Sequence, residues 1–286
     1  MSVDPNPLVV EAPPDLSPRL GPPSAAQRIL IHVPDRHNPA LQKVMADVRA
    51  DDELYTLWYC QNVNAVSRLG MSDHGPVHMQ IVANIALRLL RLLLAQGVSP
   101  SIVRDHGLSN EDAEVVVVLA ALMHDLGISI HRANHEEYSL FLANQKLPAL
   151  LAAAYPDPIT RTVVQSEVLH AIIAHRSDGR PLTLEAGVVR VADALDMAHG
   201  RSRIPFEQGE VNIHSVSAMA IERVSIEAGE SKPIRARVTM SNSAGIFQID
   251  ELLKEKLEGS GLEGYVEVLA TIERETEAPL VQILRL

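Results

Sequence analysis

The sequence predicts a mainly α protein in which a helical bundle is followed by a small α+β domain. Apolar residues recur every three or four positions from about residue 39 to residue 198, which is typical of helices with one buried face. After about residue 203, apolar and polar residues alternate, as they do in strands. Hydrophobic residues make up 47% of the chain and aromatic residues only 3%, so we expect an aliphatic core.

These patterns divide the chain into three parts. Residues 1–38 are rich in proline and predict a disordered or extended arm. Residues 39–203 form the predicted helical domain. Residues 204–286 form the predicted α+β domain, to which we assign a regulatory or oligomerisation role.

Helical periodicity defines the elements of the bundle. The expected helices span residues 40–50, 54–69, 78–96, 111–126, 136–144, 158–174 and 184–198. Ser109, with Asp112 three residues later, resembles a capping box at the start of the fourth helix. Gly97, Gly127 and Gly179 lie where helices should end.

The C-terminal part predicts the order β-β-α-β-β. Alternating segments at residues 220–229 and 235–242 precede an amphipathic segment at 246–262, and further alternating segments follow at 265–274 and 280–286. The last two segments carry few charges, and such edge strands often pair between subunits. A homodimer is therefore possible.

Charge and composition restrict the partners and the compartment. The net charge of −11, without a Lys/Arg-rich block, argues against general nucleic-acid binding. The apolar segment 81–98 is interrupted by Arg88 and Arg91, so we expect a buried helix and no membrane contact. A single cysteine and a start without signal-peptide character fit a cytoplasmic protein. A small anionic ligand at a local site is compatible with all of this.

The apolar run Leu119–Met123 ends in His124 and Asp125, and a buried pair of this kind needs a partner. Imidazole and carboxylate groups bind divalent transition metals, and one cysteine excludes a cysteine-rich site. Other candidates lie at helix ends or in apolar stripes: His74, His78, His131, His135, His170, His175, Asp193 and Asp196. Taken singly, a His or Asp in a helix is usually a cap, a surface group or a satisfied core group.

Three motifs in order carry a family resemblance. They are His78 in "HGPVHMQIVAN", the pair His124–Asp125 in "HDLG" after an apolar helix, and Asp193 in "RVADALD". Together they resemble the HD superfamily of metal-dependent phosphohydrolases over roughly residues 70–200. The resemblance implies an all-helical domain in which these four residues bind a first metal ion.

The resemblance also implies a second metal ion. HD proteins with two metals add one His after the HD turn and another before a "DG" or "TG" turn, where His135 and His175 stand here. Asp125 would then bridge the two ions. The expected cofactor is one or two divalent ions per chain, of Mn, Fe, Co, Ni or Zn, with Mg as a further possibility.

The substrate contacts are less defined. Many family members read "HDIGK", but Ile128 replaces the lysine here. Arg132, Arg176 and Arg180 are candidates to bind phosphate in its place, or they are solvated surface groups.

Further polar residues are assigned by their positions. His74, one turn before His78, and His170 are candidates for lining the substrate pocket, with a supporting hydrogen-bond role as the alternative for His170. Asp125, Asp196 and His131 are the candidate catalytic residues. Asp196 either orients a ligand, acts on the leaving group or pairs with an arginine.

We therefore expect an enzyme that hydrolyses a phosphomonoester or phosphodiester bond of a small anionic substrate, with a nucleotide as the leading candidate. The nucleophile would be hydroxide formed from water by the metal. The alternative is a non-catalytic or regulatory nucleotide-binding HD protein. A nuclease acting on RNA ends is disfavoured by the net charge.

Overall fold

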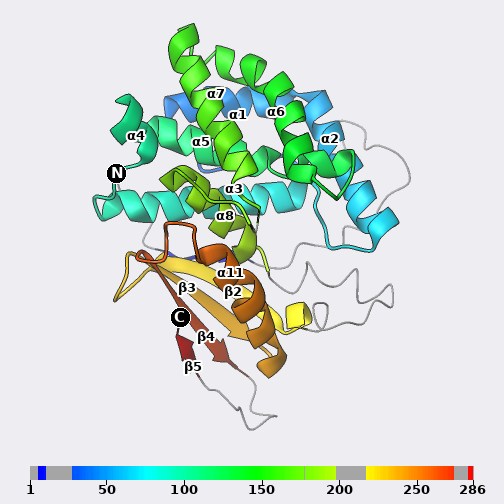
Figure 1. Ribbon diagram of the computed structural model, residues 1–286, viewed down its shortest axis with the longest axis vertical. Coiled ribbons are helices and arrows are strands. Elements are labelled where there is room, and N and C mark those ends of the chain that lie inside the picture. Colours follow the sequence, from blue (N-terminus) through cyan, green and yellow to red (C-terminus); the bar gives the residue numbers. More distant parts are fainter. Residues whose placement is uncertain (1–5, 11–27, 177, 198–216, 274–282, 286) are drawn as a thin grey trace.

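The computed structural model describes residues 6–10, 28–176, 178–197, 217–273 and 283–285. Figure 1 shows a bundle of helices above a five-stranded sheet, with the helix α11 lying against one face of the sheet. The buried apolar side chains of both parts form one continuous core. The mainly helical architecture followed by a small α+β domain is as predicted.

The helical part has the following elements: α1 Pro39–Ala50, α2 Asp52–Asn62, the π-helix η2 Val63–Arg68, α3 Pro76–Ala95, α4 Ser101–His106, α5 Asn110–Met123, the 3-10 helix η3 Leu126–Ser129, α6 His135–Ala152, α7 Pro158–Ile173 and α8 Leu184–Leu195. The helices α3, α5 and α8 contact one another at the centre. Every residue of α5 from Ala113 to Met123 is buried, which explains the unbroken apolar run from Val115 to Met123. By length and composition alone α3 could cross a membrane, but most of it is buried in the bundle.

The helix starts follow local chemistry closely. The predicted capping box is present, because Ser109 accepts from the backbone N–H of Asp112 and the Asp112 carboxylate accepts from that of Ser109. Asn38, Asp51, Asp157 and Thr183 cap α1, α2, α7 and α8 in the same way: each side chain accepts a hydrogen bond from the first turn.

Helix ends depart more from the predictions. The helix expected at 111–126 ends at Met123, because the chain tightens into η3. The helix expected at 136–144 continues through Pro148 to Ala152. The helix α4 was not predicted. Its first N–H groups, those of Ser101 and Ile102, donate to the buried carboxylate of Glu185 in α8, which a local pattern cannot reveal.

The sheet consists of β1 Leu8–Val10, β2 Ile221–Ala228, β3 Ile234–Met240, β4 Val266–Ile272 and β5 Ile283–Arg285, paired in that order. The strands β3 and β4 are parallel and the other pairs antiparallel. Their crossover carries the short 3-10 helix η5 Ser243–Gly245, the π-helix η6 Gln248–Leu253 and α11 Lys254–Leu257. The predicted order β-β-α-β-β is therefore present in β2 to β5.

The N-terminal arm, expected to be disordered or extended, is described in part. Leu8–Val10 forms the edge strand β1 next to β2. Ile31 and Val33 are buried in the core beside the helices. Residues 1–5 and 11–27 of the arm, and the domain boundary expected at residues 203–204, lie outside the described residues.

Candidate metal centre

The turn after α5 places an imidazole and a carboxylate in the interior. His124 is the C-cap of α5, and its Nδ1–H donates to the carbonyl of Ala121 at 2.8 Å. Asp125 follows as the N-cap of η3, and both side chains are buried. Gly127 allows α6 to pack closely against this turn, because a Cβ at Gly127 would overlap the carbonyl oxygen of His135. The local turn therefore brings the start of α6 to the His-Asp pair.

Several helix ends converge on this pair. The cluster consists of His74 before α3, His78 in the first turn of α3, His124 and Asp125 after α5, His135 at the start of α6, His175 after α7 and Asp193 in the last turn of α8. Side chains from five helices thus meet at one point in the bundle, as metal ligands do in helical bundles.

Asp125 lies between two pairs of imidazoles. Its Oδ2 is 3.6 Å from Nε2 of His78 and 3.4 Å from Nε2 of His124. Its Oδ1 is 3.0 Å from Nε2 of His135 and 3.8 Å from Nε2 of His175. Each carboxylate oxygen of Asp125 therefore faces a different pair.

Asp193 faces the same pair of imidazoles, His78 and His124, as Oδ2 of Asp125. Its Oδ1 is 3.6 Å from Nε2 of His78 and 3.6 Å from Nε2 of His124. Three sets have ligand atoms within 4.8 Å of one another and could hold a metal ion: His78, His124 and Asp125; His124, His175 and Asp193; and Asp125, His135 and His175.

The imidazoles share one orientation. In each, Nδ1 lies against an oxygen outside the cluster: Ser72 O for His74, Asp196 Oδ2 for His78, Ala121 O for His124, Arg132 O for His135 and Ile172 O for His175. When the rings of His74, His78, His124 and His175 are neutral, these contacts place the proton on Nδ1 and leave the lone pair on Nε2. The Nε2 atoms can therefore act as ligands.

The buried Nε2 of His124 is an unsatisfied polar atom that a cation would satisfy. It has no hydrogen-bond partner, although two carboxylates lie nearby. A buried polar atom without a partner is costly, and a divalent cation would satisfy it together with the carboxylates. Imidazole with carboxylate is a suitable ligand set for Mn, Fe, Co, Ni or Zn.

The charge states of Asp125, Asp193 and His175 suit metal binding. Burial alone would raise the pKa of Asp125, but neighbouring imidazoles, His124 first among them, hold this pKa well below its ordinary value. For Asp193 too, His124 and Lys256 outweigh burial and lower the pKa. Burial, reinforced by His124 and Lys256, lowers the pKa of His175 to about 3, so its ring is neutral.

His135 differs from the other imidazoles. Burial lowers its pKa, but the carboxylates of Asp125 and Glu136 more than compensate and raise it to about 9. Without a metal, His135 is therefore protonated at neutral pH.

Two further predicted residues lie at the cluster. Asp196 stands behind His78, with 2.6 Å between its Oδ2 and Nδ1 of the ring. Asp196 is 4% exposed, so its carboxylate contacts the candidate metal ligand His78 and does not line a solvent-filled pocket. His74 is buried with its Nε2 4.0 Å from Oδ2 of Asp125.

Two predicted histidines are not brought to the cluster. His131 is exposed, and its Nδ1 accepts a hydrogen bond from the backbone N–H of Ala133. His170 is half-buried, and its Nε2 accepts from the backbone N–H of Leu182.

The predicted arginines are mostly engaged elsewhere. Arg176 pairs with Glu137 at 2.5 Å and with Asp178 at 2.8 Å, so its charge is already balanced. Arg132 lies against the outer side of His135, 2.6 Å from Nδ1. Arg180 is exposed.

Lys256 is a further residue at the cluster, and it was not predicted from the sequence. Nζ of Lys256 lies 3.6 Å from Oδ2 of Asp193 and donates to the carbonyl of His175. Lys256 belongs to α11 of the sheet domain, some sixty residues beyond the matched motifs, and its sequence context is that of an ordinary solvent-facing charge.

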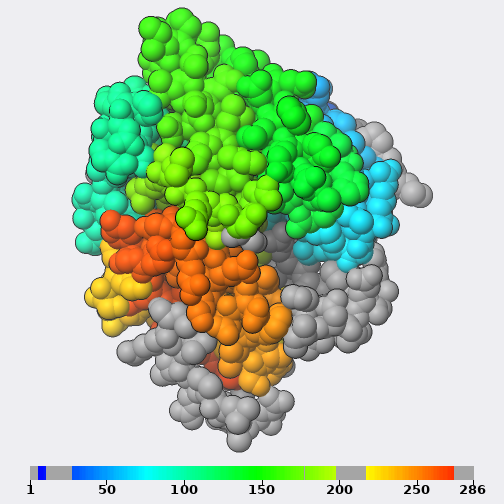
Figure 2. Space-filling view, in the orientation of Figure 1, coloured from blue at the N-terminus to red at the C-terminus, as the bar shows by residue number. Residues whose placement is uncertain are grey.

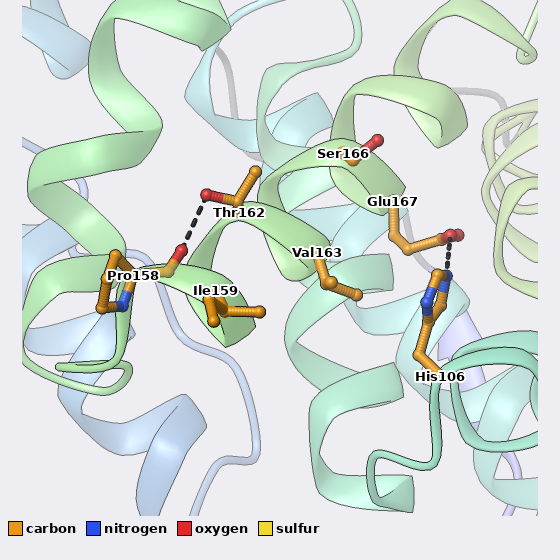
Figure 3. Close-up of a pocket in the computed structure, with 7 residues that line it drawn as sticks. All are labelled: His106, Pro158, Ile159, Thr162, Val163, Ser166 and Glu167. Atoms are coloured by element: carbon orange, nitrogen blue, oxygen red, sulfur yellow. Dashed lines mark hydrogen bonds and ion pairs between the residues drawn. The ribbon is translucent and has the colours of Figure 1, made fainter.

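A separate surface pocket lies between α4 and α7 (Figure 3). Its lining residues are His106, Pro158, Ile159, Thr162, Val163, Ser166 and Glu167. None of them belongs to the cluster, and its only paired ionisable groups are His106 and Glu167, 3.1 Å apart. This pocket therefore lacks the set of imidazole and carboxylate groups that the cluster has.

Comparison with known proteins agrees with the geometry. The model of the HD domain matches residues 77–198, which include His78, the His124–Asp125 pair and Asp193. An uncharacterized protein of Methanocaldococcus jannaschii is 47% identical over 214 residues, which are 75% of this chain and 82% of that protein. No solved structure gives a significant match.

Proposed function

Because this chain belongs to the HD domain family, we propose that it is a metal-dependent phosphohydrolase acting on a small substrate with a phosphomonoester or phosphodiester bond. Nucleotides are the leading substrate class. The observation that carries the proposal is the buried Nε2 of His124, which lacks a hydrogen-bond partner beside two ionised carboxylates. The net charge of −11 supports a small substrate rather than a nucleic acid.

Two metal ions per chain are the arrangement we propose. His78, His124 and Asp193 would hold one ion, and His135 and His175 the other. Asp125 would bridge them, which its two oxygens facing different imidazole pairs support. Cations bound there would lower the pKa of water, orient the phosphoryl group and stabilise its developing charge.

The residues of the chain itself would fix the ligands and exclude water. Asp196 holds the Nδ1–H of His78, so Nε2 stays directed at the site. The backbone carbonyls of Ala121 and Ile172 do the same for His124 and His175. The surrounding buried residues of α5 keep the cluster dry on its inner side, which strengthens electrostatic interactions there.

The first test is metal content. Wild-type protein purified without added metal or chelator should contain about two transition-metal ions per chain by elemental mass spectrometry. Asp125→Ala should lose them, whereas Asp105→Ala, at an exposed position, should keep them. No metal in the wild type, and none taken up on reconstitution, would refute the proposal.

The second test is turnover. The metal-loaded wild type would be screened against nucleoside phosphates and cyclic nucleotides for release of phosphate or nucleoside. Metal-dependent hydrolysis that Asp125→Ala abolishes would support catalysis. A protein that keeps its metal and binds nucleotides without hydrolysing any of them would instead be a regulatory nucleotide-binding protein.

A further inference from the structure

Lys256 brings a positive charge from the sheet domain to the metal centre. Its Nζ lies 3.6 Å from Oδ2 of Asp193, the carboxylate oxygen on the far side from His78 and His124. The same ammonium donates to the backbone carbonyl of His175. Lys256 therefore contacts two residues of the candidate metal centre, although the HD motifs end about sixty residues earlier.

The backbone of Lys256 is fixed to the helix that carries Asp193. The guanidinium of Arg190, one turn before Asp193 in α8, donates to the carbonyl of Lys256 at 2.9 Å and to that of Glu255 at 3.1 Å. Arg190 is 2% exposed, so these hydrogen bonds are shielded from water. The position of Lys256 relative to Asp193 is therefore set by packing and not by a loose side-chain contact.

Close packing between the domains supports the same placement. Gly187, in the same helix, meets the carbonyl of Ser260 so closely that any Cβ at Gly187 would overlap it. In Figure 2 the orange surface of the segment containing α11 adjoins the green surface of the helical part without a gap. The sheet domain is thus docked at the helix end that supplies Asp193.

Exposure at the cluster identifies the side from which a substrate can approach. The side chains of Asp193 and Lys256 are 19% and 16% exposed, whereas those of His78 and His124 are 1% and 0% exposed. An anion that reaches the metal centre from solvent on this side meets the ammonium of Lys256 next to the ligand Asp193.

The other residues considered for phosphate binding are less well placed. The lysine of the "HDIGK" pattern is Ile128 here, which is fully buried. Arg176 is balanced by Glu137 and Asp178. Lys256 has a flexible stem and a compact ammonium, which can turn from Asp193 to a phosphoryl oxygen.

We propose that Lys256 binds a phosphoryl oxygen of the substrate beside the metal centre, so that the active site is built from both domains. This inference rests on the proposed function. It assigns a binding role in the active site to the α+β domain, through one residue of α11.

The test measures binding of inorganic phosphate to metal-loaded protein by isothermal titration calorimetry. The variants are Lys256→Gln, Lys256→Arg and the control Lys254→Gln. Lys254 is in the same helix but 45% exposed, and it pairs only with Asp250 in the part of the chain that the structure describes. Metal content and the circular dichroism spectrum are recorded for each protein, so that a folding defect is recognised.

The expected result is that Lys256→Gln keeps its metal but binds phosphate about 10-fold or more weakly, because a charge-assisted hydrogen bond is lost. Lys256→Arg should recover part of the affinity, and Lys254→Gln should match the wild type. If Lys256→Gln fails to fold, Lys256→Met takes its place, because methionine keeps the apolar stem but lacks the ammonium. Wild-type phosphate affinity in Lys256→Met would overturn the role of Lys256.

Other outcomes separate this inference from the proposed function. Equal phosphate affinity for wild type and Lys256→Gln would overturn the role of Lys256 and leave the hydrolase proposal standing. A wild type that holds metal but binds no phosphate would also overturn it. A wild type that binds no metal would refute the proposed function itself.

Discussion

Asp196 accepts a hydrogen bond from His78 across 118 residues of sequence, with 2.6 Å between Oδ2 and Nδ1. Both side chains are almost completely buried, at 3% and 1% exposure. A carboxylate in this position fixes the tautomer of the ring and increases its basicity as a ligand. Asp196 therefore positions His78 at the candidate metal centre.

Replacing Asp196 by asparagine should weaken metal binding without removing the site. The amide keeps the size of the side chain, but it lacks the negative charge that favours Nδ1–H. We expect metal affinity to fall about 10-fold to 100-fold, measured by competition with a chromogenic chelator. Asp105→Asn, at an exposed position, serves as the control and should bind metal normally. Wild-type affinity in Asp196→Asn would show that His78 needs no such partner.

The close approach at Gly127 gives a prediction on stability. A Cβ at this position would overlap the carbonyl of His135 and press on the backbone of Ser139. These backbone atoms cannot rotate out of the way as the end of a side chain can. Gly127→Ala should therefore destabilise the protein by about 1–3 kcal/mol. Chemical denaturation measures the change.

Gly264→Ala is the matched control, because a Cβ at Gly264 would meet nothing within 4 Å. We expect its free energy of unfolding to stay close to that of the wild type. Since Gly127 also sets the distance between the HD turn and α6, its alanine variant should hold metal more weakly. Equal stability of the two alanine variants would mean that the turn can relax at no cost.

The sequence predicts those site residues that have a local signal or belong to motifs in a fixed order along the chain. His124 and Asp125 stand out because an ionisable pair directly follows a run of apolar residues. His78 and Asp193 could be identified because the HD motifs occur in a fixed order. These signals require no knowledge of how the helices pack.

The resemblance assigns His135, and not His131, as a metal ligand after the HD turn, and α6, which begins at His135, brings this residue to Asp125. The partner of Asp196 was beyond the sequence. Asp196 was predicted as a functional residue, but its partner could be any ligand or an arginine. The three-dimensional position of His78 makes it the partner.

Contacts between distant segments that carry no motif could not be predicted. Lys254 and Lys256 look alike in "LLKEKLEG", yet one faces solvent and the other reaches Asp193. Likewise, Leu8–Val10 in a proline-rich stretch becomes a strand only because β2, more than 200 residues later, offers an open edge. Both contacts depend on how the sheet packs on the bundle.

The raised pKa of His135 predicts a pH dependence of metal binding. Its pKa of about 9 in the metal-free protein means that the ring is protonated at pH 7. A metal ion needs the neutral ring, so metal uptake at pH 7 should release about one proton from His135. Metal affinity should therefore rise as the pH increases towards 9.

Calorimetry in buffers of different ionisation enthalpy measures this proton. The exposed His37 gives the control His37→Gln, which should release the same number of protons as the wild type. For the metal-free protein the sign is opposite: a raised pKa stabilises the fold below pH 6.5, and this contribution is lost as the pH rises through 9. Metal uptake without proton release at pH 7 would show that His135 is neutral or is not a ligand.

Arg190 joins the two parts of the molecule, which predicts the effect of its removal. Besides the carbonyls of Lys256 and Glu255, its guanidinium donates to those of Arg176 and Gly179 after α7. Methionine keeps the apolar stem but leaves these carbonyls without their charged donor. We expect Arg190→Met to lower the free energy of unfolding by about 2–3 kcal/mol.

The loss should be largest where α11 meets α8, because the carbonyls at the end of α11 lose their shared cation. Hydrogen exchange should therefore quicken in α11 more than in the buried α5. Arg223→Met is the control, since Arg223 is 49% exposed. If exchange quickens equally in α5 and α11, Arg190 supports the whole fold. If it quickens in α11 alone, Arg190 is specifically the link that holds Lys256 at the metal centre.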